Sequence, residues 1–166
     1  MKHIIFIIVF ISYLFSSVNQ NSKSIFTNEE LEWIKNNPII KVGVDEDWPP
    51  FDYLNSDKKH SGICSEYLNI ISNKTGLTFD IYANSWFKVV EKIKTKELDI
   101  LACDGKTPDR EAFLDFTTAY LSLDIVIVAR KELKINSLDE IKNYKIAVQN
   151  GDYMYDAIKK KFPNAQ

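Results

Sequence analysis

Apolar residues along the chain follow two alternating patterns, and their order is that of an α/β domain. Short apolar or alternating runs predict strands at residues 39–44, 77–82 and 98–102. Between these runs, apolar residues recur at helical spacing over residues 65–73 and 86–93, so helices are expected there. Strands that alternate with helices in this order predict a parallel sheet with right-handed crossovers.

Polar residues and glycine indicate where the helices begin and end. Thr27 and Glu30 form a capping box ahead of a further helix at residues 28–36, in which each side chain bonds the other residue's backbone N–H. Ser85 is placed to cap the second of the two helices above, and Gly76 to end the first. The apolar side of the first helix is made by Tyr67, Ile70 and Ile71.

The pattern restarts in the last third of the chain. A wholly apolar run predicts a fourth strand at residues 125–129. Ser137 and Glu140 then form a second capping box, and a strand at 145–148 and a helix at 152–161 follow. One strand and two helices cannot bury a sheet on both faces, so the chain is interpreted as incomplete.

The first residues have the composition of an export signal. Lys2 and His3 precede an apolar run at residues 4–11, which is shorter than the about 20 residues of a membrane span. A polar patch of small residues follows at 16–22. This pattern predicts a secretory signal peptide at residues 1–20, with an uncleaved N-terminal anchor or a buried core helix as alternatives. A periplasmic or otherwise extracytoplasmic protein is expected.

Composition narrows the classes of function. Hydrophobic residues make up 45% of the 166 residues, which is enough for a core and argues against disorder. The formal net charge is −2, and Lys and Arg are scattered without a basic stripe. Binding to nucleic acid is therefore not expected.

Histidine and cysteine are too sparse for a metal centre or a catalytic constellation. His60 is the only histidine after the leader, so neither a zinc cluster nor a nucleophile–base pair can be assembled from local motifs. No metal, cofactor or enzymatic activity is expected. Cys64 and Cys103 lack a motif spacing and are interpreted as two small buried residues. One disulfide is the alternative in an oxidising compartment.

A set of short motifs occurs together in a recognisable order and spacing. They are VGVD at 42–45, WPPF at 48–51, GI at 62–63 with Glu66, Trp86, LDI at 98–100, TPDR at 107–110, FT at 116–117 with Tyr120, SL at 137–138, and IAV at 146–148 with Gly151. From about Thr27 onward the chain resembles the bacterial extracellular solute-binding proteins of family 3, the two-lobed Venus-flytrap binders.

The resemblance implies an α/β periplasmic-binding-protein fold of type II. Its first lobe is expected to be nearly whole and its second lobe truncated. The divisions that follow the predicted signal peptide are a leading segment and helix at 21–37, lobe 1 at 38–124, an inter-lobe crossover at 125–132 and the start of lobe 2 at 133–166.

The resemblance also implies a function: binding of a small solute, by default an amino acid or related carboxylate, in a cleft between two lobes. The leading helix and the WPPF turn are similar to the branch that supplies sensor domains to membrane histidine kinases and diguanylate cyclases. A membrane signalling module is then the expected partner. The alternative is the substrate-binding protein of an amino-acid ABC transporter, whose partner is a permease. A dehydratase, the binding part of a lytic transglycosylase, or a purely structural exported domain are the remaining alternatives.

Arg110 is the leading candidate for ligand binding. A guanidinium presents a rigid fork of donors that matches a carboxylate, and in the family the arginine of this motif holds the ligand's α-carboxylate. The alternative is a surface arginine paired with Asp109 or Glu111. Trp48 and Trp86 resemble the two aromatic residues that sandwich a ligand side chain, with core packing as the alternative for Trp86.

The other candidates come from the same resemblance. Asp45 matches a position near the ligand's polar end, with a structural cap of the next turn as the alternative. The family usually has hydroxyl-bearing residues where this chain has Gly105 and Asp152. Asp152 would repel a carboxylate, whereas the backbone N–H of Gly151 can donate to one. These two differences from the usual family residues, at Gly105 and Asp152, favour the sensor branch over a standard amino-acid binder. The remaining candidates are Phe51 and Thr107.

Overall fold

The computed structural model describes residues 25–163, in two units that divide after Asn36. The predicted signal peptide at residues 1–20 lies outside the described residues. In the first unit, helix α2 spans Asn28–Asn36, and its capping box is confirmed. The Thr27 hydroxyl accepts from the Glu30 N–H at 3.2 Å, while the Glu30 carboxylate accepts from the Thr27 N–H at 2.7 Å. None of the helices in residues 25–163 is both long and apolar enough to cross a membrane.

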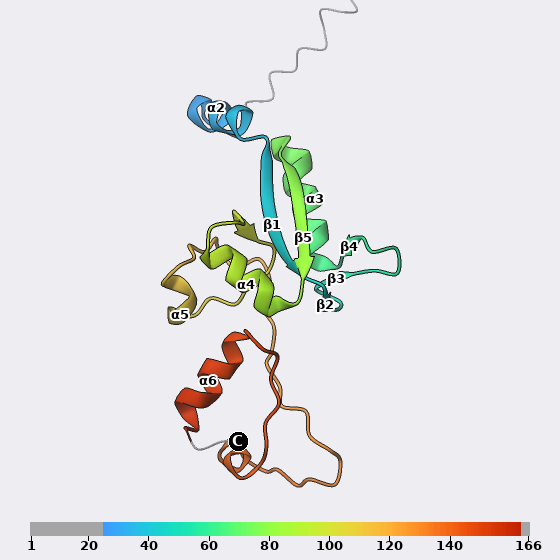
Figure 1. Ribbon diagram of the computed structural model, residues 1–166, viewed down its shortest axis with the longest axis vertical. Coiled ribbons are helices and arrows are strands. Elements are labelled where there is room, and N and C mark those ends of the chain that lie inside the picture. The colour runs from blue at the N-terminus through green and yellow to red at the C-terminus, as the bar shows by residue number, and fades with distance from the viewer. Residues whose placement is uncertain (1–24, 164–166) are drawn as a thin grey trace, which may run out of the picture. The chain divides into compact units, whose positions relative to one another are not determined.

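The second unit is built on a parallel sheet, as predicted. Its strands are β1 (Ile39–Asp45), β5 (Thr78–Asn84) and β6 (Ile100–Leu101), and they lie in the order β5-β1-β6. The long β1–β5 pair is visible in Figure 1. β1 is therefore the central strand, and its carboxyl end lies beside that of β5.

Two helices cover opposite faces of this sheet. Helix α3 (Ile63–Thr75) places Leu68 against Val42 and Val44 of β1. Helix α4 (Trp86–Lys94) packs on the other face, where the predicted helical spacing is confirmed. Its core cluster contains Trp86, Val89, Val90, Ile93 and Leu98.

Gly43 allows α4 to approach the sheet closely. A Cβ at this position would lie 2.6 Å from Cγ1 of Val89 and 2.8 Å from Cδ1 of Leu98. Both distances are far below van der Waals contact, so an added methyl group must displace the packed side chains. Gly43→Ala is expected to lower the free energy of unfolding in urea by about 1–3 kcal/mol. Lys41→Ala, at an exposed position of the same strand, is the matched control and should change it by less than about 0.5 kcal/mol.

A small antiparallel sheet follows β1. It contains β2 (Asp47–Trp48), β3 (Asp52–Leu54) and β4 (His60–Ser61). The tip of the β3–β4 hairpin is a polar loop, in which the Asn55 side chain accepts from the N–H groups of Asp57 and Lys59. This hairpin leads directly into α3 and thereby links β1 to that helix.

The buried side of α3 differs from the prediction. Tyr67, Ile70 and Ile71 are exposed, whereas Cys64, Ser65 and Leu68 are buried. The largest apolar residues therefore do not face the sheet, because the orientation of this helix follows the contacts of Cys64 and Leu68. Ser85 precedes α4 as expected, but no backbone N–H bonds its side chain, so the predicted cap is wrong.

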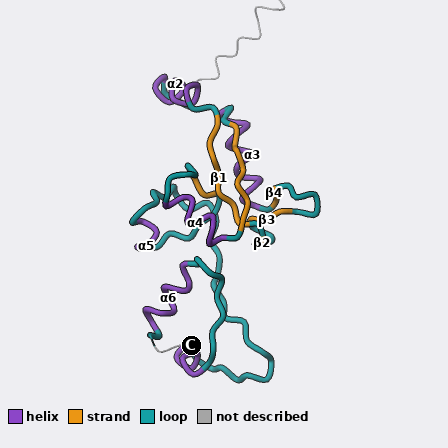
Figure 2. The backbone as a smooth tube through the Cα atoms, viewed as in Figure 1, coloured by secondary structure: helices purple, strands orange, loops and turns teal. Residues whose placement is uncertain are grey.

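The last third of the described chain contains α5 (Pro108–Glu111), the short 3-10 helix η1 (Leu138–Asn143) and α6 (Tyr153–Lys161). The helix predicted at 152–161 is confirmed, but the strands predicted at 125–129 and 145–148 are wrong. Figure 2 draws both segments as loop. A strand needs a hydrogen-bonded neighbour, and within residues 25–163 neither segment pairs with one. Val128 is accordingly 90% exposed.

Candidate functional site

The carboxyl ends of the parallel strands bring polar residues to one edge of the sheet, where ligands of open α/β sheets bind. Asp45 is the last residue of β1 and is buried. Its partner in register is Asn84, the last residue of β5. Cys103 and Asp104 come shortly after β6. The candidate site is built around this edge.

Arg110 reaches the site from α5. Thr107 caps this helix, and its hydroxyl accepts from the Arg110 N–H at 3.2 Å. Pro108 follows at the first helical position, where its fixed φ suits the turn. The Arg110 side chain is 7% exposed, so it is not the surface arginine that the alternative interpretation required.

The guanidinium of Arg110 lies among aromatic rings and a backbone carbonyl. Nη2 donates to the Gly151 carbonyl at 2.6 Å. The guanidinium carbon is 5.9 Å from the ring centre of Trp86 and 5.8 Å from that of Phe113. Such contacts hold the cation in a partly dry environment, which strengthens its interaction with an anion. The structure thus brings Arg110, Trp86 and Gly151 together.

Asp104 is the counter-charge beside Arg110. Its side chain is 5% exposed, and Oδ2 lies 3.5 Å from Nε of Arg110. That distance is an ion pair but is too long for a good hydrogen bond, and within the described residues Oδ2 has no hydrogen-bond partner. The other oxygen, Oδ1, accepts from the Gly105 N–H at 2.8 Å.

Burial raises the pKa of Asp104 to about 6, although the charge of Arg110 and the Gly105 N–H oppose the shift. The charge of Asp152 raises this pKa further. Because folding raises the pKa above its ordinary value, this carboxyl contributes most to stability at acid pH. That contribution is lost as the pH rises through about 6. At neutral pH the ionised Asp104 carboxylate therefore lowers the free energy of unfolding.

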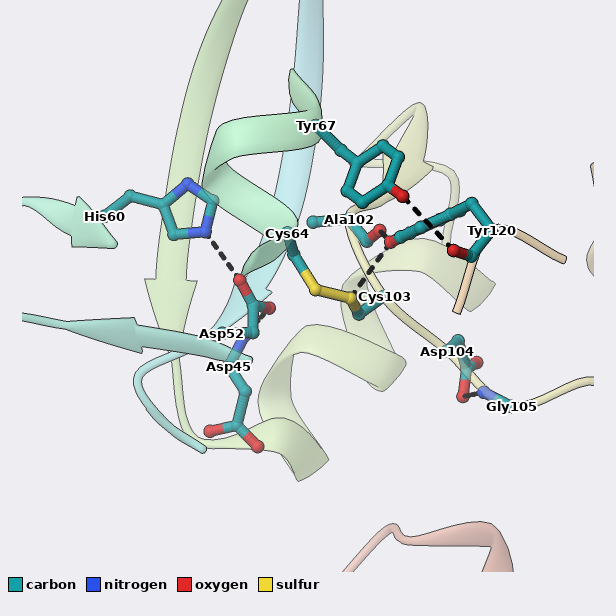
Figure 3. Close-up of a disulfide and its surroundings, with 10 residues drawn as sticks. All are labelled: Asp45, Asp52, His60, Cys64, Tyr67, Ala102, Cys103, Asp104, Gly105 and Tyr120. Atoms are coloured by element: carbon teal, nitrogen blue, oxygen red, sulfur yellow. Dashed lines mark hydrogen bonds and ion pairs between the residues drawn. A yellow bond between two sulfur atoms is a disulfide. The ribbon is translucent and has the colours of Figure 1, made fainter. Parts of the chain in front are cut away.

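Asp45 belongs to a second polar network. Its backbone N–H donates to Oδ2 of the fully buried Asp52 at 2.9 Å, and Oδ1 of Asp52 lies 2.5 Å from Nε2 of His60. Figure 3 shows the Asp52–His60 pair. The Asp45 side chain accepts from the Asp47 N–H at 3.0 Å and from Nε2 of Gln149 at 2.9 Å. The hairpin is thereby connected to the end of β1.

Cys64 and Cys103 form a disulfide, so the favoured interpretation as two free buried cysteines is wrong. Both residues are buried as expected, with their Cα atoms 6.2 Å apart. Figure 3 shows the bond joining the start of α3 to the segment after β6. Spacing in sequence carried no sign of this contact, because parallel-sheet topology brings the two segments together.

Tyr120 packs on the disulfide (Figure 3). Its hydroxyl donates to the Ala102 carbonyl at 2.5 Å and lies 3.0 Å from Sγ of Cys103. The Tyr67 ring is 4.3 Å from that of Tyr120, and its hydroxyl donates to the Tyr120 carbonyl at 3.3 Å. Burial raises the pKa of Tyr120 to about 12, with smaller effects from Asp52 and Tyr67. The segment that carries Tyr120 is therefore held beside the disulfide.

The other predicted residues are placed differently. Trp48 is exposed and packs on the half-buried Phe51, with 4.9 Å between ring centres, so the structure does not place it against Trp86. Asp152 caps α6 by accepting from the Met154 N–H at 2.7 Å. Gly151 has φ +82°, which suits glycine.

Gly105 has a packing reason for its lack of a side chain. A Cβ there would lie 2.8 Å from Cε1 of Tyr153. The ring of Tyr153 thus occupies the space that a hydroxyl-bearing residue would need. Burial raises the pKa of Tyr153, with smaller contributions from the charges of Asp152 and Asp104.

Sequence reasoning missed Asp104, Gln149 and Tyr153 at this site. The signal available for Asp104 was its place directly after a strand and next to the Gly105 departure. Gln149 contacts a residue 104 positions earlier, which no local pattern reveals. Within residues 25–163 no group of His, Cys, Asp and Glu is arranged to hold a metal ion.

A hollow of about 300 Å³ lies elsewhere, among residues 146–150 and α6. Its lining includes Ile146, Val148 and Ile158, which are apolar residues of the predicted second lobe. Gln149, which donates to Asp45, also lines this hollow, whereas Arg110 and Trp86 do not. We interpret it as part of that lobe's apolar packing and not as the solute site.

Comparison with known proteins agrees with this geometry. The family described as bacterial extracellular solute-binding proteins, family 3, matches residues 40–165. The virulence sensor protein BvgS of Bordetella pertussis is 24% identical over 143 residues, which are 85% of this chain and 12% of BvgS. The arginine-binding extracellular protein ArtP of Bacillus subtilis is 27% identical over 111 residues, 66% of this chain and 43% of ArtP. The chain thus spans less than half the length of either relative.

Solved structures show the same fold. The periplasmic domain of Bordetella pertussis BvgS superposes with a TM-score of 0.75 at 23% identity, covering 91% of this chain and 30% of that one. The ancestral amino-acid-binding protein AncCDT-1, a precursor of cyclohexadienyl dehydratase, gives a TM-score of 0.70 at 24% identity. That match covers 82% of this chain and 62% of AncCDT-1. The fold is a type II periplasmic-binding-protein fold, of which this chain forms part.

Proposed function

Because the chain belongs to the bacterial extracellular solute-binding proteins of family 3, we propose that it binds a small solute outside the cytoplasm. The solute is an amino acid or related carboxylate, held between the strand-end edge of the first lobe and the opening turn of the second. The observation that carries this proposal is the buried Arg110 guanidinium beside Trp86 and Gly151.

A buried guanidinium at this edge is suited to an anionic group. Its planar fork of N–H donors matches a carboxylate in two parallel bonds. One donor of the guanidinium, Nη2, now bonds the neutral carbonyl of Gly151. A charged carboxylate in place of that carbonyl would form a stronger hydrogen bond with the same donor. The Trp86 ring offers a flat surface next to that anion position.

Sensing is the role we favour for this binding. BvgS is named as a sensor, and its similarity to this chain covers 85% of this chain. In this proposal a membrane signalling module reads the bound state, and the predicted signal peptide exports the domain. The alternative is a transporter substrate-binding protein, which the similarity to ArtP favours. We propose no catalysis, because the relatives above are named for sensing or binding.

Thermal unfolding of the intact protein tests the proposal. Any solute that binds the folded state alone stabilises it, by about 2.7 kcal/mol at a concentration 100 times its Kd. We expect a rise in Tm with at least one compound from a panel of amino acids and related carboxylates, and none with glucose as an uncharged control. An unchanged Tm across the whole panel would contradict the proposal.

A further inference from the structure

The outer side of helix α3 is apolar, although it faces away from the sheet. Ile70 is 50% exposed and Ile71 is also exposed, while Leu68 on the opposite side of the helix is buried. Tyr67 precedes Ile71 by four residues, so the two side chains share one side of the helix. An exposed cluster of large apolar residues marks a surface that binds another protein surface.

Tyr120 extends this surface beyond the helix. Its ring centre is 4.3 Å from that of Tyr67, and Figure 3 shows the two side chains next to each other. Both rings are held in place, because the Tyr67 hydroxyl donates to the Tyr120 carbonyl and the Tyr120 hydroxyl donates to the Ala102 carbonyl. Fixed aromatic rings bury a large area at little entropic cost, and tyrosine is enriched in protein interfaces. We call Tyr67, Ile70, Ile71 and Tyr120 the outer α3 face.

Charged residues near the two ends of α3 define which partner fits the outer α3 face. Glu66, Ile70 and Lys74 follow one another at intervals of four residues and form a single stripe along the helix. Glu66 lies in the first turn and Lys74 in the last, both are exposed, and no ion pair among residues 25–163 includes either of them. The stripe is thus apolar at its centre and opposite in charge at its ends, so it is complementary to itself when it is turned around.

We propose that the outer α3 face binds a second copy of this chain, with the two α3 helices antiparallel about a two-fold axis at Ile70. Glu66 and Lys74 each lie about 6 Å from Ile70 along the helix, at 1.5 Å per residue. The axis therefore places Glu66 opposite Lys74 of the partner subunit, and the same pair forms a second time, as in any contact with two-fold symmetry. A parallel arrangement would place like charges opposite each other. The dimer does not depend on the solute proposed above.

The size of the outer α3 face sets the expected strength of this dimer. Helix α3 has 13 residues and is therefore about 20 Å long. A standard protein interface buries about 800 Å² on each partner, and one short helix with a neighbouring tyrosine reaches the lower end of that range. We therefore expect a reversible dimer with a Kd of about 10 μM.

Sedimentation velocity of the intact protein tests the dimer. We expect the wild type to be dimeric at about 100 μM and monomeric at about 1 μM, on either side of this Kd. Ile70→Glu places a charge on the axis and should be monomeric at both concentrations, with an unchanged Tm at the lower one. Leu31→Glu is the control, because it places the same charge at an exposed apolar position on α2 and should dimerise as the wild type does.

Two outcomes of this experiment overturn the inference. A wild type that is monomeric at both concentrations shows that the outer α3 face does not bind a second copy. A monomeric wild type together with a lower Tm of Ile70→Glu shows in addition that this face is covered within a single chain. Dimerisation that persists in Ile70→Glu places the interface elsewhere.

Reversing the charges tests the antiparallel arrangement itself. Glu66→Lys and Lys74→Glu each place like charges opposite each other at both pairs, so each variant alone should dimerise at least about fivefold more weakly. An equal mixture of the two variants should regain the affinity of the wild type, because opposite charges then face each other at both pairs. A role within one subunit cannot produce this recovery. A mixture that associates no better than its components overturns the arrangement.

Discussion

Replacing Arg110 with alanine should weaken the binding of a carboxylate solute by at least about 100-fold, which is about 2.7 kcal/mol. The guanidinium is buried and lies near the rings of Trp86 and Phe113, so its charge is poorly screened by water. Removing it deletes the charge-assisted bonds to the solute and leaves that carboxylate near the negative charges of Asp104 and Asp152. Calorimetry with the panel compound that raises Tm most is the measurement.

Two further variants make this result specific. Arg110→Lys retains the charge but loses the planar fork, so we expect an intermediate loss of at least about tenfold. Arg130→Ala removes an exposed arginine and should leave the affinity unchanged. A thermal unfolding transition measured for each variant without solute shows whether that variant folds. A folded Arg110→Lys or Arg110→Ala variant with wild-type affinity contradicts the assignment of Arg110.

Removing the disulfide should have the largest effect on stability. Replacing Cys64 and Cys103 together by alanine frees a loop whose ends are 39 residues apart, so the unfolded chain gains conformational freedom. We expect the free energy of unfolding to fall by about 3–4 kcal/mol, measured by urea denaturation. Tyr120 loses its contact with Sγ of Cys103 as well, and the segment that carries it should become more susceptible to proteolysis.

Reduction of the wild type provides the control for this prediction. A thiol reductant should lower the wild-type unfolding midpoint and leave that of the alanine pair unchanged. Ser65→Ala, at the buried position next to Cys64, controls for the loss of local buried contacts, here a hydroxyl that donates to the His60 carbonyl, and should cost less. Equal stability of the wild type and the alanine pair would show that the cross-link contributes nothing.

The parallel sheet was predictable because its information is local. In β1 and on the buried face of α4, apolar residues recur at the spacing of a strand and of a helix, and both elements are found as expected. The strands predicted at 125–129 and 145–148 failed for the opposite reason. A strand is defined by its neighbour, and an apolar run alone does not provide one within the described residues.

The site was predictable in part. The motif around Arg110 and the expected sheet placed this residue and Trp86 near the same edge, and the structure brings them within 5.9 Å. The contact between Arg110 and Asp104, the bond from Gln149 to Asp45 and the cross-link of Cys64 depend on tertiary structure. Trp48 shows the converse: the motif predicted a wall of the cleft, and the structure places its ring on Phe51. Its part in binding stays a prediction.

The central position of β1 has a consequence for the order in which the protein is completed. This strand is synthesised before either neighbour, since β5 begins at Thr78 and β6 at Ile100. Until β6 has left the ribosome, β1 lacks one of its two partners, and Cys103 is not yet available to Cys64. The strand made first is thus the last to be fully paired, so its apolar residues are exposed during synthesis for longer than those of β5 or β6.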